Sequence, residues 1–381
     1  MWQMRAKLLF AEWLCLVLLA AGVIGWQVYE KDPYLHFHAP DTERYYYTLD
    51  NERFQDDGIL RQFCYDAVIT GTSMTENFRT SDLDGLFGVH SVKATQAGAS
   101  YRDIAELLGS AFHYTPDLKM VVRGLDLNVL DITGSRVTNR PDYLYDENTW
   151  NDVRYLLNRD VLFKRVYSMV KAMKEEGFRP GITDFDDYAS WHYSAGINEA
   201  AGDIPGILEL REAGTPIHLS KEEAERIRQN VEENVIDLAA EHPETEFYLF
   251  FTPYSILWWK ANVEDGTVYR YLEAEELAAE LMLEYKNIHL FSFGCRTDIT
   301  ADLNNYIDSI HYCEWINRLI LKWMSKGSYE LTRDNFRDRF REELETYTSF
   351  DYGRLLDQED YENDEQALAV LEQELADFSS D

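Results

Sequence analysis

One serine in this chain has the neighbours that a catalytic nucleophile requires. Ser73 follows an apolar, β-branched run at residues 68–70 and a glycine, Gly71, and the residues after it can open a helix. The pattern predicts a strand, a tight turn and a helix start, which places Ser73 at the carboxyl end of a strand beside amides that can stabilise an oxyanion. Gly-x-Ser also occurs in ordinary turns, so other residues must support the hypothesis.

Asp308 and His311 could complete such a catalytic group. Of the nine histidines, only His311 has an aspartate three residues before it, and both residues follow the last predicted strand. A nucleophilic serine needs a base, and the imidazole needs a carboxylate that fixes its tautomer and stabilises its charged form. In a parallel sheet, the loop that carries them opens on the same edge as Ser73.

Alternating strand and helix patterns predict parallel βαβ units and a layered α/β sheet. The predicted strands are residues 68–70, 91–95, 119–125, 246–251 and 288–293, and the predicted helices are 101–108, 160–176, 220–238, 272–285 and 315–323. Residues 131–216 form an insertion that is rich in aromatic residues, among them Trp191 and Tyr193. These rings could line a substrate site or simply fill a core, and the pattern favours neither.

The amino terminus predicts a membrane anchor. Residues 8–29 are apolar apart from Glu12 and Gln27, and Arg5 and Lys7 precede them. This length suffices to cross a bilayer, and the preceding positive charge predicts a cytoplasmic segment 1–7 with the remainder exported. The apolar run continues beyond its small residues, which favours an uncleaved anchor over a signal peptide. Residues 30–59 would be juxtamembrane.

The charge balance excludes one class of partner. The 381 residues include 69 acidic and 36 basic side chains, a net charge of −33, which repels nucleic acid and anionic membrane surfaces beyond an inserted anchor. We expect residues 326–381 to form a helical acidic tail, with a short amphipathic helix near 367–375. Its charge is expected to serve solubility rather than a specific partner.

Neither a metal site nor an organic cofactor is expected. His36 and His38 would share one strand face, but no third ligand is evident, and packing or stacking is the favoured interpretation. No cysteine pair has metal-ligand spacing. A disulfide between Cys295 and Cys313 is one alternative. Three buried free thiols, those of Cys64, Cys295 and Cys313, are the favoured one.

Four short blocks together resemble the SGNH (GDSL-type) hydrolase superfamily. They are Gly71-Thr72-Ser73, Gly98 after the second strand, Gly124-Leu125-Asp126 after the third, and Asp308-x-x-His311. The anchored, exported layout is most similar to the cell-envelope branch, which includes DltD-type teichoic-acid D-alanylation proteins and alginate O-acetylation proteins. The resemblance covers residues 60–325, leaves the insertion unmatched, and implies a three-layer, flavodoxin-like domain with a central parallel sheet.

The resemblance also implies roles for individual residues. Ser73 would be the nucleophile, His311 the general base and Asp308 its orienting carboxylate, with the amides of Ser73 and Gly98 in the oxyanion hole.

The chain departs from the family pattern at two positions. Thr72 stands where the hydrolases usually carry Asp. Asp126 occupies the place of an Asn that donates to the hole, so Asp126 would have to be protonated, Asn128 would have to substitute, or the hole would have two donors. Arg123 could hold an anionic substrate group or pair with Asp126.

The leading hypothesis is therefore an exported, membrane-anchored serine esterase or O-acyltransferase that acts on a cell-envelope polysaccharide or its acylated precursor. The alternative is a catalytically weak SGNH-like domain that binds an envelope polymer or scaffolds a membrane acyltransferase partner. An unrelated α/β protein would need Ser73 and His311 to lie far apart in the folded chain.

Overall fold

The computed structural model describes residues 2–137, 139–146, 148–191, 196, 200–202 and 206–357. The chain forms two compact units, each built from two separate stretches of sequence. Unit 1 comprises residues 1–63 and 139–184, and unit 2 comprises residues 64–138 and 185–381. The segment 139–184, which lies inside the predicted insertion, therefore clusters with the amino-terminal residues.

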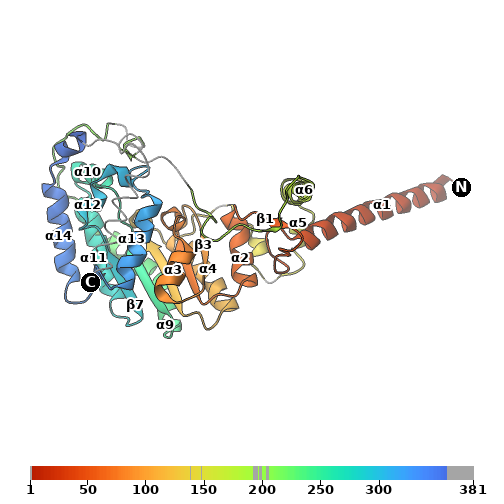
Figure 1. Cartoon of the computed structure of the whole chain (residues 1–381), viewed down its shortest axis with the longest axis horizontal. Coiled ribbons are helices and arrows are strands. Elements are labelled where there is room, and N and C mark those ends of the chain that lie inside the picture. Colours follow the sequence, from red (N-terminus) through yellow and green to blue (C-terminus); the bar gives the residue numbers. More distant parts are fainter. Residues whose placement is uncertain are drawn as a thin grey trace. The chain divides into compact units, whose positions relative to one another are not determined.

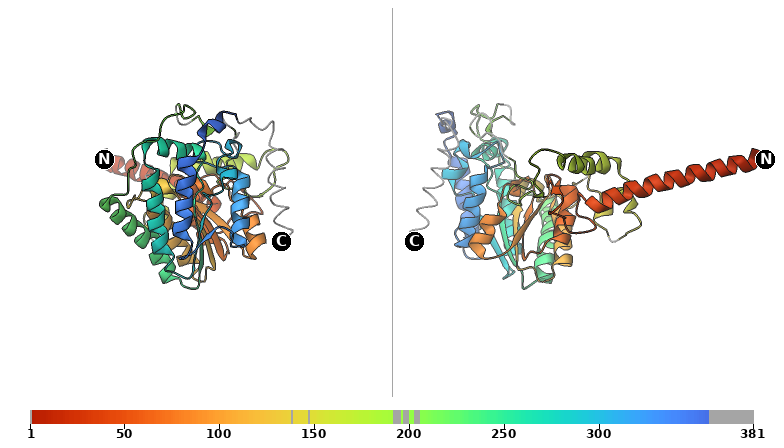
Figure 2. Two further views of the ribbon diagram at one scale, coloured as in Figure 1. Left: turned by 90° about the vertical axis from the view of Figure 1, so that its left-hand side faces the viewer. Right: turned by 45° about the vertical axis from the view of Figure 1, so that its right-hand side comes forward.

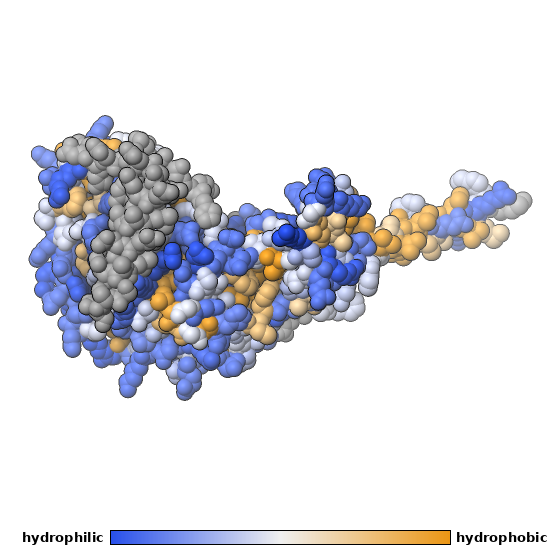
Figure 3. Space-filling view, in the orientation of Figure 1, coloured by the Kyte–Doolittle hydropathy of each residue, from blue (hydrophilic) through white to orange (hydrophobic). Residues whose placement is uncertain are grey.

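Unit 1 is organised around helix α1 (Trp2–Lys31), which is one continuous helix (Figure 1 and the right-hand view of Figure 2). Its surface is hydrophobic over most of its length (Figure 3). It is long and apolar enough to span a membrane or to be a signal sequence. Its last turns belong to a folded core, because Val28 packs in one buried cluster with Tyr34 and Tyr155.

The rest of unit 1 consists of short elements around that core. They are β1 (Tyr46–Tyr47), α2 (Glu52–Gln62), η3 (Asp142–Leu144), α5 (Val153–Leu156), η4 (Val161–Val166), α6 (Tyr167–Ala172) and β5 (Gly181–Ile182). Strands β1 and β5 pair in parallel. The predicted helix at residues 160–176 is found as the π-helical turn η4 followed directly by α6.

Unit 2 contains a six-stranded, mostly parallel sheet with the order β3-β2-β4-β6-β7-β8. Its strands are β2 (Ala67–Gly71), β3 (Ser91–Thr95), β4 (Met120–Leu125), β6 (Glu246–Phe251), β7 (Ile288–Ser292) and β8 (Glu330–Leu331). The first five pair in parallel, and β8 joins β7 antiparallel. Every residue of β2, β3 and β4 is buried, as expected when both faces of a parallel sheet are covered.

Contacts from neighbouring residues of β6 show which helices cover each face. Tyr248 packs against Phe87 of α3, whereas Phe247, which points to the opposite face, packs near Phe112 of α4. Helix α13 packs against α3, and the continuous helix α8-η5-α9 packs against α4 and α11 (Figure 1). These helices are α3 (Thr80–Phe87), α4 (Tyr101–Tyr114), α8 (Lys221–Val231), η5 (Glu232–Ile236), α9 (Asp237–Glu241), α11 (Val268–Met282) and α13 (Glu314–Ser325).

The remaining elements of unit 2 are short turns and two further helices. They are η1 (Ser73–Thr75), η2 (Leu127–Val129), α10 (Ile256–Asp265), α12 (Thr297–Thr300), η6 (Leu303–Asn305), α14 (Phe336–Ser349) and η7 (Tyr352–Asp357). Helix α14 packs against α10 and α11, and its Phe340, Glu343 and Tyr347 are buried. The predicted amphipathic helix near 367–375 lies outside the described residues.

All four cysteines lie in the described part of the chain and carry free thiols. Because the thiols of Cys295 and Cys313 are both free, the disulfide between them is not formed. Cys313 is buried and Cys295 is half-buried. Cys64 is exposed, which differs from the expected buried thiol, because it lies in the turn between α2 and β2.

Candidate active site

Ser73 lies on a tight turn at the carboxyl end of β2. Gly71 closes the strand with φ +143°, and a Cβ there would lie 2.7 Å from Thr75 Oγ1. Thr72 caps the following turn, since its hydroxyl accepts a hydrogen bond from Met74 N. The Thr75 hydroxyl donates to the carbonyl of Thr72 over 2.9 Å. Gly71 and the buried side chain of Thr75 together explain why the chain turns here and presents Ser73.

Ser73, His311 and Asp308 form a continuous hydrogen-bonded series. Ser73 Oγ lies 2.7 Å from His311 Nε2, and His311 Nδ1 lies 2.6 Å from Asp308 Oδ2. The other Asp308 oxygen accepts the main-chain N–H groups of Ile310 and His311 at 2.8 and 2.7 Å. Burial acts to raise the pKa of Asp308, but the bonds and charge of His311 and these amides outweigh it and hold that pKa below its ordinary value.

The loop that carries His311 is tied directly to the Ser73 turn. The hydroxyl of Tyr312, the residue after His311, donates to the carbonyl of Met74 over 2.7 Å. On the other side of the loop, Ser255 donates to the carbonyl of Ser309 over 2.6 Å. Ser73 and His311, which are 238 positions apart in the sequence, are thus held within hydrogen-bonding distance by contacts on both sides of the His311 loop.

Asp126 is an acceptor for three hydroxyl groups. Its Oδ2 accepts from Thr72, and its Oδ1 accepts from Thr252 and Tyr254 at 3.1 and 2.9 Å. Burial raises the pKa of Asp126, although the bonds from these hydroxyls oppose the rise. Both side-chain oxygens of Asp126 therefore accept hydrogen bonds from within the protein, and these bonds stabilise the turn before Ser73.

The other oxyanion candidates lie in different surroundings. Gly98 has φ +69° in the turn between β3 and α4, and a Cβ added there would meet no atom within 4 Å, so its surroundings are open. Asn128 is exposed on η2, where it lines a small pocket with Glu223 and Arg270. The structure does not bring Asn128 and Ser73 together in that pocket.

Arg123 is buried on the face of the sheet that α4 and η5 cover. Its guanidinium donates to the carbonyl oxygens of Asn234 and Tyr101 at 2.7 and 3.2 Å and lies over the Tyr101 ring. Burial lowers the pKa of Arg123 to about 10. These contacts are to main-chain carbonyls and a ring, rather than to Asp126 or the Ser73 turn.

Trp191, from the aromatic segment, lies against the imidazole of His311. The two rings meet edge to face, with centroids 5.6 Å apart and an interplanar angle of 87°. Trp191 N donates to Asn77 Oδ1 over 3.0 Å, which fixes the main chain beside the Ser73 turn. Tyr193, the other predicted substrate contact, lies outside the described residues.

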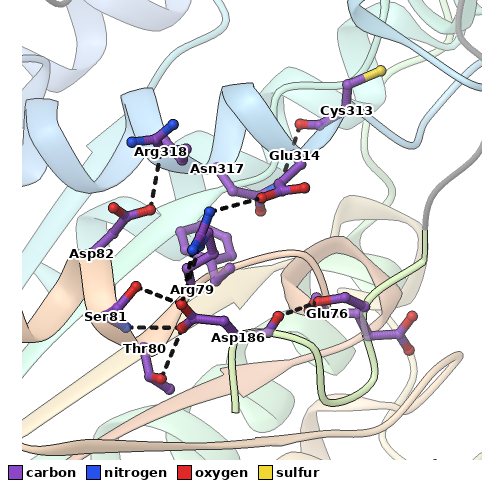
Figure 4. A network of polar contacts seen from close by, with 12 residues as sticks. Glu76, Arg79, Thr80, Ser81, Asp82, Asp186, Cys313, Glu314, Asn317 and Arg318 are labelled. Carbon is purple, nitrogen blue, oxygen red and sulfur yellow. Dashed lines mark hydrogen bonds and ion pairs between the residues drawn. The ribbon is translucent and has the colours of Figure 1, made fainter. Parts of the chain in front are cut away.

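Asp186 fastens the segment that leads to Trp191. Its carboxylate accepts bonds from the Thr80 hydroxyl, from the amide and hydroxyl of Ser81, and from the guanidinium of Arg79, all at the start of α3 (Figure 4). Arg79 also reaches Glu314, the first residue of α13, at 3.7 Å. Arg79 thus links the Trp191 segment to the helix that follows His311.

Lys93 makes a second connection beneath the same segment. This fully buried ammonium donates to the carbonyl oxygens of Glu76 and Phe78 at 2.5 and 3.0 Å and to the Ser190 hydroxyl at 3.1 Å. Sequence patterns alone did not single out Lys93, Arg79 or Asp186. A lysine at the centre of a predicted strand was the available signal for Lys93.

The two histidines considered as metal ligands both bond to protein groups of unit 1. His36 Nε2 lies 3.0 Å from Asp152, and His38 contacts the carbonyls of Tyr29 and Ala39. His38 also meets the Tyr29 ring edge to face. Among the residues that the structure describes, no three His, Cys, Asp or Glu side chains gather as a metal site.

Comparisons with known proteins assign no family. No protein-family model and no curated protein matches the sequence. A solved structure described as "a putative platelet activating factor from Streptococcus pneumonia" is similar to this chain at 12% sequence identity, over 72% of this chain and 89% of that chain, with a TM-score of 0.39. This likeness is too weak to support a functional conclusion, which must therefore rest on the geometry of the site.

Proposed function

We propose that this chain is a membrane-anchored serine esterase or O-acyltransferase that uses Ser73, His311 and Asp308. The observation that carries the proposal is the hydrogen-bonded series from Ser73 Oγ through the imidazole of His311 to Asp308. A carboxylate, an imidazole and a serine hydroxyl in this order are the groups that nucleophilic acyl transfer needs.

In the proposed reaction, Ser73 Oγ attacks the carbonyl carbon of an ester while His311 Nε2 takes its proton. The amides of Ser73 and Gly98 stabilise the negative charge on the former carbonyl oxygen. When the tetrahedral intermediate collapses, the ester C–O bond breaks and His311 returns the proton to the leaving alcohol. Water or a sugar hydroxyl then attacks the acylated Ser73, again with His311 as base, which gives hydrolysis or transfer respectively.

The order and orientation of the strands support an SGNH-type, three-layer assignment. When the five parallel strands are numbered by their order in the sequence, they lie across the sheet in the order 2-1-3-4-5. This is the order of the flavodoxin-like fold. Ser73 follows the first of these strands, and the Asp308–His311 loop lies beyond the fifth. Carboxyl ends of the strands are where open α/β sheets bind ligands.

A cell-envelope glycan or its acylated precursor is the substrate class that we propose. In this scheme α1 is the single-pass anchor, its amino terminus stays in the cytoplasm, and unit 2 is extracytoplasmic. The exposed basic residues Arg5 and Lys7 before the apolar run support that orientation. Trp191 beside His311 supplies a ring against which a sugar can stack.

A burst assay with p-nitrophenyl acetate tests the enzymatic proposal. The full-length protein should release p-nitrophenol in a burst equal to its concentration, Ser73→Ala should abolish the burst, and Asp308→Asn should slow it by about 10³- to 10⁴-fold. Addition of an acceptor oligosaccharide, with mass spectrometry of the products, separates transfer from hydrolysis. A folded parent with neither a burst nor a steady release of p-nitrophenol that depends on Ser73 would contradict the enzymatic proposal.

One observation favours the second candidate, a catalytically weak domain that binds an envelope polymer or scaffolds a membrane acyltransferase. Asp126 accepts three hydroxyl bonds where related hydrolases place a donor, so two amides would have to stabilise the oxyanion. Loss of one oxyanion donor typically costs about 10²- to 10³-fold in rate. Polymer binding that Ser73→Ala leaves unchanged, together with no burst, would support this candidate.

A further inference from the structure

Unit 1 exposes four large apolar side chains near the place where α1 enters its core. Trp150 is 90% exposed, Val153 51%, Leu157 45% and Phe163 62%. We name these four residues the collar. They lie on or beside α5 and η4, and both elements pack against α1. Exposed apolar side chains that cluster on a surface mark sites where a protein or a membrane binds.

The collar reaches the part of α1 that is still apolar. A side chain at Gly25 would meet Leu156 and Leu157 at 3.8 and 4.0 Å. Gly25 lies about 6 Å before Tyr29 along the helix axis, given the rise of an α-helix. A hydrocarbon core takes roughly 20 residues, so an apolar run that begins at Leu8 leaves it near residue 27. Leu157 therefore lies level with the boundary of the hydrocarbon.

The aromatic residues of α1 at the same height fit a membrane interface. Trp26 and Tyr29 are 59% and 43% exposed, and their rings stack at 6.0 Å. Trp and Tyr gather at the headgroup level of a bilayer, where one end of the ring is apolar and the other polar. Trp150 supplies a further exposed indole from unit 1. In Figure 3 the hydrophobic surface of α1 continues onto the adjoining part of this unit.

The charge of this segment also differs from that of the chain as a whole. Residues 151–179 contain seven Lys or Arg and four Asp or Glu, within a chain whose net charge is −33. Juxtamembrane Lys and Arg side chains are attracted to anionic headgroups. The segment that bears Val153, Leu157 and Phe163 is thus the part of the protein suited to an anionic lipid surface.

We propose that the collar lies in the headgroup region of the bilayer that α1 enters, so that unit 1 rests on the lipid surface. The inference rests on the proposed role of α1 as an anchor and adds a second, peripheral contact. Docking of this kind combines buried apolar side chains with attraction of basic residues to anionic lipid.

Depth measurements on spin-labelled full-length protein test the proposal. In a Cys15→Ser, Cys64→Ser background, nitroxide labels are placed at Leu157→Cys and Phe163→Cys, and the protein is reconstituted into phosphatidylcholine–phosphatidylglycerol vesicles. Both labels should be several-fold less accessible to a water-soluble nickel chelate than a label at Glu175→Cys, an exposed position of the same unit. Both should also be more accessible to oxygen.

A label at Leu18→Cys in α1 distinguishes failure of the collar from failure of the anchor. If Leu18 is in hydrocarbon while positions 157 and 163 behave as Glu175 does, the collar lies in water and the proposal is overturned. Protection of positions 157 and 163 from both reagents would also overturn it, because a protein would then cover the collar. Exposure of the Leu18 label to nickel would reject the anchor itself.

A second variant removes the collar and leaves α1 unchanged. Leu157→Ser with Phe163→Ser should make a label at Val153→Cys several-fold more accessible to nickel, because unit 1 is no longer held at the surface. The matched control is Glu175→Ser with Glu176→Ser, which should leave that label unchanged. Equal accessibility in the two variants would overturn the proposal.

Discussion

The Asp126 side chain is a hydrogen-bond acceptor for three hydroxyl groups beside the Ser73 turn. Its two oxygens accept hydrogen bonds from Thr72, Thr252 and Tyr254, which ties the turn before Ser73 to the end of β6. A side chain engaged in this way stabilises the turn as an acceptor. Thr252 and Tyr254 lie more than 120 positions away in sequence, so their convergence on Asp126 could not be read from local patterns.

Replacement of Asp126 should therefore reduce stability. Asp126→Ala leaves three buried hydroxyls without their acceptor, and we expect a loss of about 1–3 kcal/mol in the free energy of unfolding, measured by urea denaturation. The matched control is Asn128→Ala, an exposed position two residues away, with an expected change within about 0.5 kcal/mol. Equal effects of the two substitutions would contradict the bracing role.

The three residues of the proposed triad were accessible to sequence reasoning because each lies beside a strong local signal. Ser73 follows an apolar strand and a glycine, and Asp308 and His311 follow the last parallel strand. The position of Trp191 was not accessible in this way. It depends on Asn77 and on Asp186, whose contacts with the start of α3 join segments about 100 residues apart.

At the scale of elements, Arg79 connects the start of α3 with Asp186 and with the first residue of α13. Arg79→Ala should lower the rate of Ser73 acylation by roughly 10- to 100-fold, because small displacements of catalytic groups are costly. The expected effect is on rate, with the unfolding midpoint nearly unchanged, since Arg79 is partly exposed.

Arg318→Ala is the control for Arg79. Arg318 pairs with Asp82 at 3.1 Å between the same two helices, and its ion pair does not include Asp186 (Figure 4). Acylation by this variant should stay within about twofold of the parent, as expected when only a partly exposed ion pair is lost. A burst assay that finds both variants equally slow would assign Arg79 a general structural role.

Helix α14 contains a buried carboxyl group, that of Glu343, which should make the stability of the protein depend on pH. Glu343 accepts a bond from Ser292 over 2.6 Å, and burial raises its pKa above the ordinary value. Because the pKa is higher in the folded state than in the unfolded chain, the folded state binds more protons above about pH 4.3, and the free energy of unfolding should fall as pH rises through the folded-state pKa.

Glu343→Gln removes this titration. The variant should gain stability relative to the parent as pH rises from 5 to 8, measured by thermal unfolding at each pH. Glu342→Gln, an exposed neighbour on the same helix, should follow the parent. Parallel pH profiles for the parent and Glu343→Gln would show that Glu343 does not titrate in this range.

The pattern of strands and helices predicted the five parallel strands of unit 2, because each is a short run with apolar or β-branched residues that alternates with turns and helical segments. Strand β8 was missed, since it has two residues and lies at the antiparallel edge. Helix α10 was also missed, although Ser255 caps it and Gly266 ends it with φ +77°. Tryptophan and β-branched residues after a proline made that stretch resemble a loop.

At the scale of the whole molecule, the discontinuous construction of unit 1 was beyond sequence reasoning. Residues 139–184 join the amino-terminal residues through a core in which Val28 of α1 meets Tyr155 and Val161. Asp32, directly after α1, accepts bonds from three consecutive amides, those of His36, Phe37 and His38. No periodic pattern links segments that lie so far apart in the chain.

The proposed anchor role predicts that α1 is retained. The mature protein isolated from membranes should keep residues 1–31, because the apolar run continues beyond its small residues as far as Tyr29. Intact-mass measurement, together with resistance of the protein to extraction by alkaline carbonate, checks this. A mature protein that begins near residue 22 and is released from the membrane fraction would contradict it.

Labelling by a fluorophosphonate determines whether Ser73 is an activated nucleophile. The full-length parent should be labelled at Ser73, identified by peptide mass spectrometry, while folded Ser73→Ala and His311→Ala variants should be unlabelled. Ser349→Ala, which removes an exposed serine on α14, should be labelled as the parent is. A well-folded parent that remains unlabelled, or a Ser73→Ala variant labelled at the parental rate, would contradict the account.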